Sequence, residues 1–207
     1  MINLEKFKTL IFRLQEVYNA EKIHLSELDS AIGDGDHGVN MARGFDAVAA
    51  AWNAAPPADL AAAFKQVSMA LIKTVGGASG PLYGTFFMKM GMVMGGKAEI
   101  GLDEWIDGVE KGIAGIAMMG KARRGDKTMI DAWEPALEAL KAAKAAGKDL
   151  SGALADSAKA AEEGAAATIP LVAKKGRASY LGERSAGHQD PGATSAAFLL
   201  KAAAENL

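Results

Sequence analysis

The amino-acid sequence predicts an all-α fold, an eight-helix antiparallel up-and-down barrel or bundle. In several segments apolar residues recur at three- and four-residue spacing, which is typical of helices with one buried face. Other segments are rich in Ala, Leu and Met, which favour helix, and no segment reads as a convincing strand. Several connections between these segments, at 53–59, 95–101 and 146–149, are short, and short connections favour antiparallel neighbours.

The first predicted element is one long amphipathic helix over about residues 3–28, with Glu21 as the single break in its apolar stripe. That stripe consists of Leu4, Phe7, Ile11, Leu14, Tyr18, Leu25 and Leu28. Composition predicts the next helices over about 39–53, 58–74 and 80–94. Apolar spacing predicts helices over about 102–116 and 129–140, and composition predicts the last two over about 150–167 and 192–205.

Bulk properties narrow the class of protein. Half of the 207 residues are hydrophobic, which is enough for one domain, residues 1–207, with a real core. A net charge of -2 gives no reason to expect nucleic acid as a partner, and the absence of Cys excludes thiolate chemistry. Residues 74–88 carry no charge but include four Gly and Pro81, so we expect no membrane insertion and a soluble, cytoplasmic protein.

The loops at the two ends of such a bundle differ in composition. The connections at 53–59, 95–101 and 146–149 are ordinary Ala, Pro, Gly and Lys linkers. The other loops, which fall together at the opposite end, hold the Gly clusters, two of the three His and most of the clustered charge. They span residues 29–38, 76–81, 120–128 and 174–192. This composition indicates a functional site at one end of the bundle.

Three aspartates in the first of these loops form a candidate metal site. Asp29, Asp34 and Asp36 stand across a helix end and a Gly-containing turn, so their carboxylates can converge. Converging carboxylates repel one another, and Mg²⁺ relieves this while keeping positions open for substrate phosphates. The alternative is a plain turn with Asp36 as an N-cap. An EF-hand is excluded because Phe45 stands where its bidentate Glu belongs.

Two further loops read as helix starts suited to anions. Ser79, followed by Gly80 and Pro81, is expected to be an N-cap, and Asp190 with Pro191 shows the same pattern. Together with the start after Asp36, three helix N-termini would point at one spot, as phosphates require. The alternative is three well-formed caps and nothing more.

The basic residues of these loops allow two readings. The segment 120–128 is not a Walker A loop, because Asp126 separates Gly125 from Lys127 and no strand precedes it. Arg123, Arg124 and Lys127 either clamp phosphate or belong to a solvated loop.

Two histidines also lie in these loops. We interpret His37 and His188 as groups that orient phosphates, in preference to phosphorylated nucleophiles.

Taken together, four loop motifs resemble those of the nucleotide-binding subunits of dihydroxyacetone kinases, over nearly the whole chain and in the same order. The motifs are Asp29 with Ile-Gly-Asp-Gly-Asp-His-Gly-Val-Asn-Met, then Gly-Gly-Ala-Ser-Gly-Pro-Leu-Tyr-Gly-Thr, then Gly-Asp-Lys-Thr-Met, then the run from Lys-Gly-Arg-Ala-Ser-Tyr to Gly-His-Gln-Asp-Pro-Gly-Ala-Thr-Ser. The resemblance implies an eight-helix barrel that holds ADP or ATP at one rim through two Mg²⁺ ions.

The resemblance also implies roles for individual residues. It makes Asp29, Asp34 and Asp36 the metal ligands. It places at the nucleotide His37, Gly38, Asn40, Ala78, Ser79, Gly120, Met129, Arg177, Asp190 and Gly192. No nucleophile is expected on this chain, because dihydroxyacetone is implied to sit on a separate kinase subunit, held by a His of that partner.

The resemblance leaves the source of the phosphoryl group open. In one version of the family ATP is consumed. In the other, ADP stays bound as a coenzyme and is rephosphorylated by a phosphohistidine protein of the sugar phosphotransferase system, and a free-standing chain of this length is more typical of the second version. Alternatives are another small ketose as acceptor, a nucleotide-state sensor that binds a regulator, or a helical carrier of a small ligand.

Overall fold

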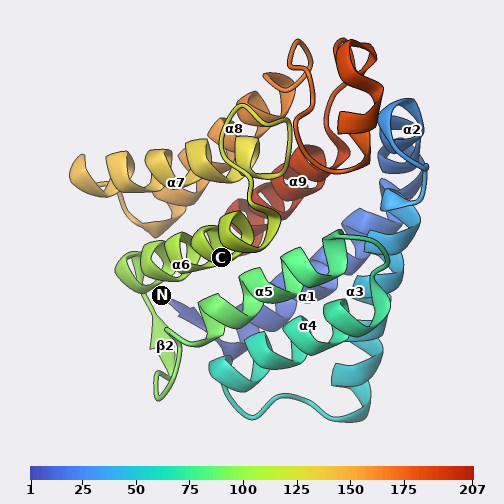
Figure 1. The fold of residues 1–207 in the computed structure, drawn as a ribbon. Helices are drawn as coiled ribbons and strands as arrows, with labels where there is room; N and C mark the ends of the chain where they lie inside the picture. The colour runs from blue at the N-terminus through green and yellow to red at the C-terminus, as the bar shows by residue number, and fades with distance from the viewer.

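The computed structural model describes residues 1–207, which form nine α-helices, one 3₁₀ helix and two short strands (Figure 1). The α-helices are α1 (Leu4–Ala20), α2 (Lys22–Ile32), α3 (His37–Ala54), α4 (Leu60–Thr74), α5 (Ser79–Gly91), α6 (Leu102–Gly120), α7 (Ile130–Ala145), α8 (Leu150–Ala166) and α9 (Pro191–Asn206). The 3₁₀ helix is η1 (Arg177–Ser185), and the strands are β1 (Ile2–Asn3) and β2 (Glu99–Ile100). The all-α prediction is confirmed.

The long helix predicted over residues 3–28 is in fact two helices, α1 and α2, which meet at Glu21. Glu21 has φ -89° and ψ 5°, outside the helical range, although its amide still donates to Val17 O at 2.8 Å. The interruption of the apolar stripe at Glu21 marks this break. Counted as one continuous element, α1 and α2 bring the total to the predicted eight.

The strands are a small departure from the prediction that no strand forms. Ile2 pairs with Ile100 and Asn3 with Glu99 in an antiparallel ribbon of two residues on each side. Two residues are too few to show the alternation that identifies a strand in a sequence. The ribbon buries Ile2 and Ile100 completely, and the Asn3 side chain accepts a hydrogen bond from Lys6 N at 3.0 Å, which caps α1.

The helices close into a ring in which each contacts the next along the chain and α9 returns to α1. Antiparallel packing follows from the short loops. A core of 46 buried residues fills the interior, and aromatic pairs such as Phe7 with Phe64 and Phe86 with Trp133 lie across it, with ring centroids 4.0 and 4.2 Å apart. None of the helices is both long and apolar enough to cross a membrane.

The up-and-down order gathers the loops into two sets, as Figure 1 allows the reader to follow. The loops after α2, α4, α6 and α8 lie at one end, which we call the site end, and η1 belongs to the last of them. The loops after α3, α5 and α7, together with the β1–β2 ribbon, belong to the opposite end, which we call the far end.

Candidate functional site

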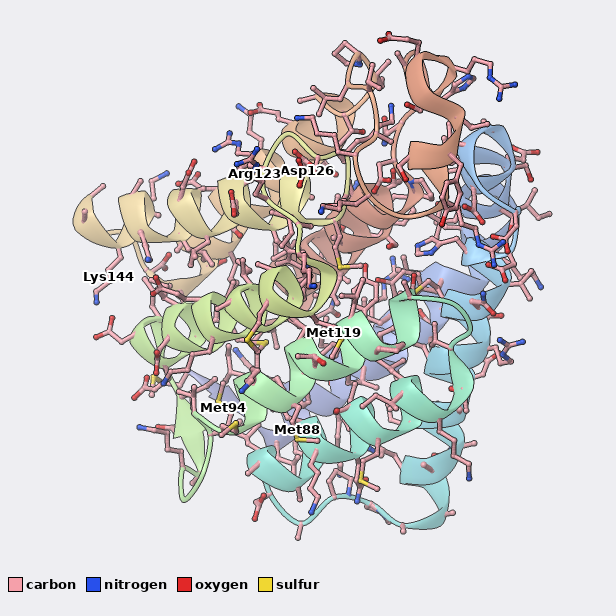
Figure 2. All side chains as sticks on the ribbon, viewed as in Figure 1. Met88, Met94, Met119, Arg123, Asp126 and Lys144 are labelled. Carbon is pink, nitrogen blue, oxygen red and sulfur yellow. The ribbon has the colours of Figure 1, made fainter.

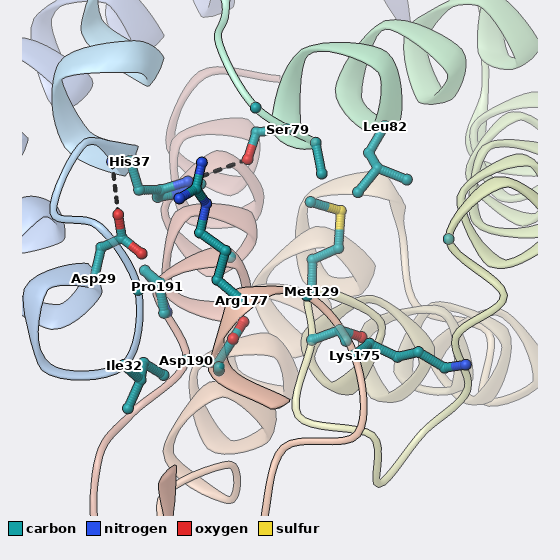
Figure 3. A pocket seen from close by; sticks show the side chains of 18 of the residues that line it. Asp29, Ile32, His37, Ser79, Leu82, Met129, Lys175, Arg177, Asp190 and Pro191 are labelled. Atoms are coloured by element: carbon teal, nitrogen blue, oxygen red, sulfur yellow. Dashed lines mark hydrogen bonds between the residues drawn. The ribbon is translucent and has the colours of Figure 1, made fainter. Parts of the chain in front are cut away.

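A cavity of about 430 Å³ opens at the site end and is lined by all four of its loops. This volume lies in the range of small-molecule and cofactor sites. Figure 3 shows Asp29, His37 and Pro191 on one side of the cavity and Leu82 and Met129 on the other. We call the side with Asp29 and His37 the polar wall, although Ile32 and Pro191 also lie there, and the side with Leu82 and Met129 the apolar wall.

The three aspartates converge as their spacing predicts. One carboxylate oxygen from each of Asp29, Asp34 and Asp36 lies within 4.8 Å of the other two. The Asp29 side chain, at the end of α2, is fixed because its Oδ2 accepts from the amides of Asp36 at 2.8 Å and His37 at 3.1 Å. Gly33 leaves room for this arrangement, since a Cβ there would lie 2.1 Å from Asp29 Oδ1.

The electrostatics of the three aspartates fit a hard divalent cation. Burial raises the pKa of Asp29, the two amides that it accepts from lower it, and the neighbouring charges of Asp34 and Asp36 raise it again. The ion pair at the cluster joins Asp34 to Arg177, with Oδ2 and Nη2 2.9 Å apart and both side chains partly exposed. Three carboxylates facing one guanidinium leave negative charge that Mg²⁺ would neutralise, and carboxylate oxygens are the ligands it prefers.

Three helix starts meet at the cavity, and they differ in how their amides are satisfied. At α9 the predicted cap is confirmed, because Asp190 Oδ2 accepts from Ala193 N at 2.7 Å. At α3, Asp36 makes no side-chain cap, and Asp29 takes its place as acceptor. At α5 the prediction that Ser79 is the N-cap was wrong, since Ala78 holds that position and no side chain caps the helix. The first-turn amides of α5 are left for an anion.

His37 is buried in a chain of hydroxyl groups that runs into the core. Its Nδ1 lies 3.2 Å from Ser79 Oγ and its Nε2 lies 2.9 Å from Ser195 Oγ, which is also 2.7 Å from Tyr83 Oη. Burial lowers the pKa of His37 to about 4, although the negative charge of Asp36 has the opposite, smaller effect. Both ring nitrogens of a neutral imidazole thus lie within hydrogen-bond distance of serine hydroxyls, and the role of His37 toward phosphate stays a prediction.

The basic residues of the loop after α6 do not form a phosphate clamp. Arg124 pairs with Glu138 at 3.0 Å, and Arg123 is 85% exposed near Asp126. Lys127 is buried and donates to backbone carbonyls of the segment 168–188, although part of its side chain lines the cavity. The sequence left two readings open, a phosphate clamp and a solvated loop. Arg123 and Arg124 fit the solvated loop, and Lys127 fits neither reading.

Most of the sequence-predicted residues are brought together in the cavity wall. The residues that line it are Asp29, Asp34, Asp36, His37, Ala78, Ser79, Gly120, Met129, Arg177, Asp190 and Gly192. Gly38 and Asn40 lie outside the lining. Gly38 permits α3 to approach α2, because a Cβ there would lie 2.0 Å from Lys22 O, and Asn40 packs beside Gly76 and accepts from Arg43. His188 is exposed and also stands outside the lining.

The apolar wall was missed by sequence reasoning. Leu82, Ile116 and Ile130 line the cavity together with Met129, and Ile32 lines it on the side of Asp29 (Figure 3). Each belongs to, or directly adjoins, the apolar pattern of a helix, so nothing in the sequence separates these residues from ordinary core residues. Tyr180, which is 87% exposed on η1, also lines the cavity, and no apolar spacing in the sequence indicates it as a site residue.

Comparisons with known proteins agree with this geometry. A family model described as the DAK2 domain matches residues 31–205. The ADP-binding subunit DhaL of the PEP-dependent dihydroxyacetone kinase of Escherichia coli is 42% identical over 189 residues, which cover 91% of this chain and 90% of that protein. The ADP-binding subunit DhaL of the PTS-dependent dihydroxyacetone kinase of Lactococcus lactis is 39% identical, with 97% and 96% covered.

A solved structure shows the same fold. The dihydroxyacetone kinase from C. freundii in complex with AMP-PNP and Mg²⁺ matches with a TM-score of 0.74 and 28% identity. The match covers 96% of this chain and 33% of that one, so this chain spans about a third of the larger kinase. The chain therefore belongs to the DAK2 domain family, whose members include the dihydroxyacetone kinase nucleotide-binding subunits that its loop motifs resemble.

Proposed function

We propose that this chain is the nucleotide-binding subunit of a dihydroxyacetone kinase. The observation that carries the proposal is the position of Asp29, Asp34 and Asp36 beside the uncapped start of α5, in a cavity with one polar and one apolar wall. Acidic ligands for a cation, open amides for an anion and an apolar surface for a ring are together what a Mg²⁺-nucleotide needs.

The polar wall would hold the metal and the phosphates. Asp29, Asp34 and Asp36 are the proposed ligands of two Mg²⁺ ions, and the first-turn amides of α5 after Ala78 and Ser79 would bind phosphate oxygens. Bound Mg²⁺ would neutralise charge on the phosphoryl group that is transferred. Arg177, now paired with Asp34, is within the lining and supplies further positive charge.

The apolar wall would hold the base. Leu82, Ile116 and Met129 offer an apolar surface from three different helix ends. Gly120 and Gly192 leave the backbone accessible beside it, and the proposed nucleotide contacts include both. Burial of a flat ring against these side chains would contribute affinity in proportion to the apolar area removed from water.

This chain would position the phosphoryl group and supply no nucleophile. Both ring nitrogens of His37 are occupied by Ser79 and Ser195, so His37 is unsuited to carry a phosphoryl group. Dihydroxyacetone would be bound by a separate kinase subunit, and transfer would occur across the contact between the two chains. The site end, where the cavity opens, would face that partner.

We favour bound ADP as a coenzyme that a phosphohistidine protein of the phosphotransferase system rephosphorylates. The support is that relatives named as PEP-dependent and PTS-dependent kinases match this chain over nearly their full length. A subunit of an ATP-consuming kinase for dihydroxyacetone or another small ketose is the second candidate, favoured by the likeness to a larger kinase solved with AMP-PNP and Mg²⁺.

A single-turnover assay tests the function and separates the two versions. The protein is loaded with ADP and Mg²⁺ and mixed with a dihydroxyacetone-binding subunit, dihydroxyacetone and either a phosphohistidine donor or ATP in solution. We expect dihydroxyacetone phosphate to form with the donor while the nucleotide stays bound. Product formed only with ATP and with ADP release supports the second candidate. No product from either source, with each partner shown to be active, contradicts the proposed function.

A further inference from the structure

Lys127 is the one buried Lys or Arg of the chain, with 1% of its surface exposed. Its ammonium nitrogen is within hydrogen-bond distance of four backbone carbonyls. It donates to Thr168 O at 2.8 Å, to Leu171 O at 3.1 Å and to Ile169 O at 3.3 Å, and it also donates to His188 O. An ammonium has three protons and no acceptor, so this side chain is fully used inside the protein.

The four carbonyls mark the two ends of one long connection. Thr168, Ile169 and Leu171 follow the last turn of α8, where the partial negative charge of a helix C-terminus favours a cation. His188 stands at the other end, two residues before the Asp190 cap of α9. One ammonium therefore joins the two ends of a loop of about twenty residues. Its hydrogen bonds offset part of the conformational entropy that is lost when the ends of the loop are held together.

The loop that Lys127 closes forms part of the cavity wall. Lys175, Arg177 and Tyr180 lie within it and line the cavity, as does Asp190, which follows it (Figure 3). Asp190 also joins the two ends of the loop, because its amide donates to Thr168 Oγ1 at 2.9 Å. Displacement of the loop would move charged groups on one side of the site.

Lys127 is itself held in place by its own loop. Thr128 N donates to Asp131 Oδ2 at 2.8 Å, and Lys174 N donates to Asp126 O at 3.0 Å, which ties this loop directly to the one after α8. Lys127 has φ +61°, a left-handed conformation that residues with a Cβ rarely adopt. Such a conformation persists when surrounding contacts enforce it, and here the carbonyl contacts of Lys127 do so.

We propose that Lys127 is a positioning residue of the nucleotide site: its buried ammonium holds the segment 168–188 against the loop after α6, so that Arg177 and Asp190 face the bound nucleotide. The inference rests on the proposed function, since it assigns a role toward the same nucleotide. Lys127 acts through the loop and does not touch phosphate.

The first test compares Lys127→Met, which keeps the length of the side chain without its charge, with the wild type. We expect the dissociation constant for Mg²⁺-ADP to rise about tenfold or more, because small misplacements of a binding wall have effects of this size. Amide hydrogen exchange should accelerate in residues 168–188 and stay unchanged in α1 and α4. Leu154→Ala, a buried change on α8 near its start, is the control for general loss of stability.

Chemical rescue makes the test specific for the charge. The chain has no Cys, so Lys127→Cys carries a single thiol, which can be alkylated in denaturant before refolding. Alkylation with 2-bromoethylamine rebuilds an ammonium at nearly the length of Lys, and iodoacetamide adds a neutral group. We expect the aminoethylated protein to recover affinity to within about threefold of wild type and the neutral adduct to remain weak.

The outcomes separate this inference from the proposed function. Failure of the wild type to bind Mg²⁺-ADP overturns the proposed function and the role of Lys127 with it. If the wild type binds Mg²⁺-ADP and Lys127→Met binds it with the same affinity, the role of Lys127 alone is overturned. The same follows if Leu154→Ala, at a melting temperature equal to that of Lys127→Met, weakens Mg²⁺-ADP binding as much.

A second variant covers the case in which Lys127→Met does not fold. Ser185→Ala loosens the same loop by removing the acceptor of Ala173 N, 2.8 Å away, without leaving a buried charge. It must weaken Mg²⁺-ADP binding and speed exchange in residues 168–188, and normal affinity with faster exchange contradicts the inference.

Discussion

The two ends of the bundle use the same local devices for different purposes. At the far end, Asp59 accepts from Ala62 N at 2.7 Å, Asp149 accepts from Gly152 N at 2.8 Å, and Glu104 accepts from Gly101 N at 2.9 Å. The first two caps are exposed and the third is half-buried, and exposed ion pairs such as Lys144 with Asp103 at 2.7 Å accompany them. Figure 2 shows Lys144 toward that end of α7 and Arg123 and Asp126 in the loop before it.

At the site end, many of the polar groups are buried. Of the buried polar and charged residues, only Ser68 and Ser157 lie away from the site-end loops and the helix turns that adjoin them. Three carboxylates converge there, and the start of α5 has no cap. This difference between the two ends shows that a helix start alone says little about function. A cap that is exposed and satisfied stabilises a helix, whereas buried or unsatisfied groups at a helix start indicate a ligand.

The largest expected effect comes from adding and removing the ligand of the site end. At about a thousand times its dissociation constant, Mg²⁺-ADP should raise the free energy of unfolding by about 4 kcal/mol. EDTA should abolish this gain, because the phosphates would then face three unneutralised carboxylates. Denaturant unfolding with and without ADP, Mg²⁺ and EDTA measures it, and Asp149→Asn at the far end should keep the whole gain. Equal stabilisation by ADP in EDTA would argue against the metal site.

The second comparison sets Ser195→Ala against Ser157→Ala, both at fully buried serines. Ser195→Ala removes the partner of Tyr83 Oη and His37 Nε2, and leaving two buried polar groups unpaired costs about 3 kcal/mol. Ser157 Oγ has no partner, so its removal should be neutral or slightly stabilising. Urea unfolding measures both, and we expect one cooperative transition for residues 1–207. A similar loss of stability in both variants would contradict a stabilising role for the hydrogen bonds between His37, Ser195 and Tyr83.

The third comparison concerns the pH dependence of Asp190, a buried cap, in protein free of metal and nucleotide. Burial raises the pKa of Asp190 to about 7, with smaller opposing effects from the Ala193 amide and Lys127. The native state therefore keeps a proton that the unfolded chain releases, and this group makes stability fall as pH rises from about 4 to about 7.

Asp190→Asn keeps an acceptor for the cap and does not titrate. Its stability relative to wild type should increase across that range by an amount on the order of 2 kcal/mol. Thermal unfolding at a series of pH values measures the difference, which a pH-independent offset would contradict.

The smallest expected effect belongs to the far end. Asp59→Ala removes an exposed cap and should cost about 1 kcal/mol of stability. The affinity for Mg²⁺-ADP should stay within about twofold of wild type, because Asp59 is remote from the cavity and its cap acts on α4 alone. Calorimetric titration checks this, and a marked loss of affinity would show that the two ends are coupled.

Much of the fold follows from local patterns in the sequence. The apolar stripes and Ala-rich segments predict the helices, and the spacing of Asp29, Asp34 and Asp36 around a Gly-containing turn predicts their convergence. These features depend on residues close together in the chain. The short η1 helix shows no apolar periodicity, so the sequence predicts no secondary structure in the loop that contains it.

What could not be predicted depends on distant parts of the chain. The burial of Lys127 depends on carbonyls between 41 and 61 residues away, and a basic run gives no sign of it. The apolar wall of Leu82 and Ile116 resembles core because a residue that faces a cavity has the same periodicity as one that faces another helix. Gly38 and Asn40 stand next to site residues in sequence, yet Gly38 packs against Lys22 and Asn40 lies beside Gly76, and neither lines the cavity.

The most direct test of the account is the nucleotide content of the purified protein, measured by chromatography and mass spectrometry after denaturation, beside an Asp34→Asn variant. We expect close to one ADP per chain in the wild type and little or none in the variant, because Asp34 is one of three charges that would hold the metal. A wild type that binds neither ADP nor ATP, even with Mg²⁺ supplied, or a variant that retains its full complement, would contradict the proposed metal-nucleotide site.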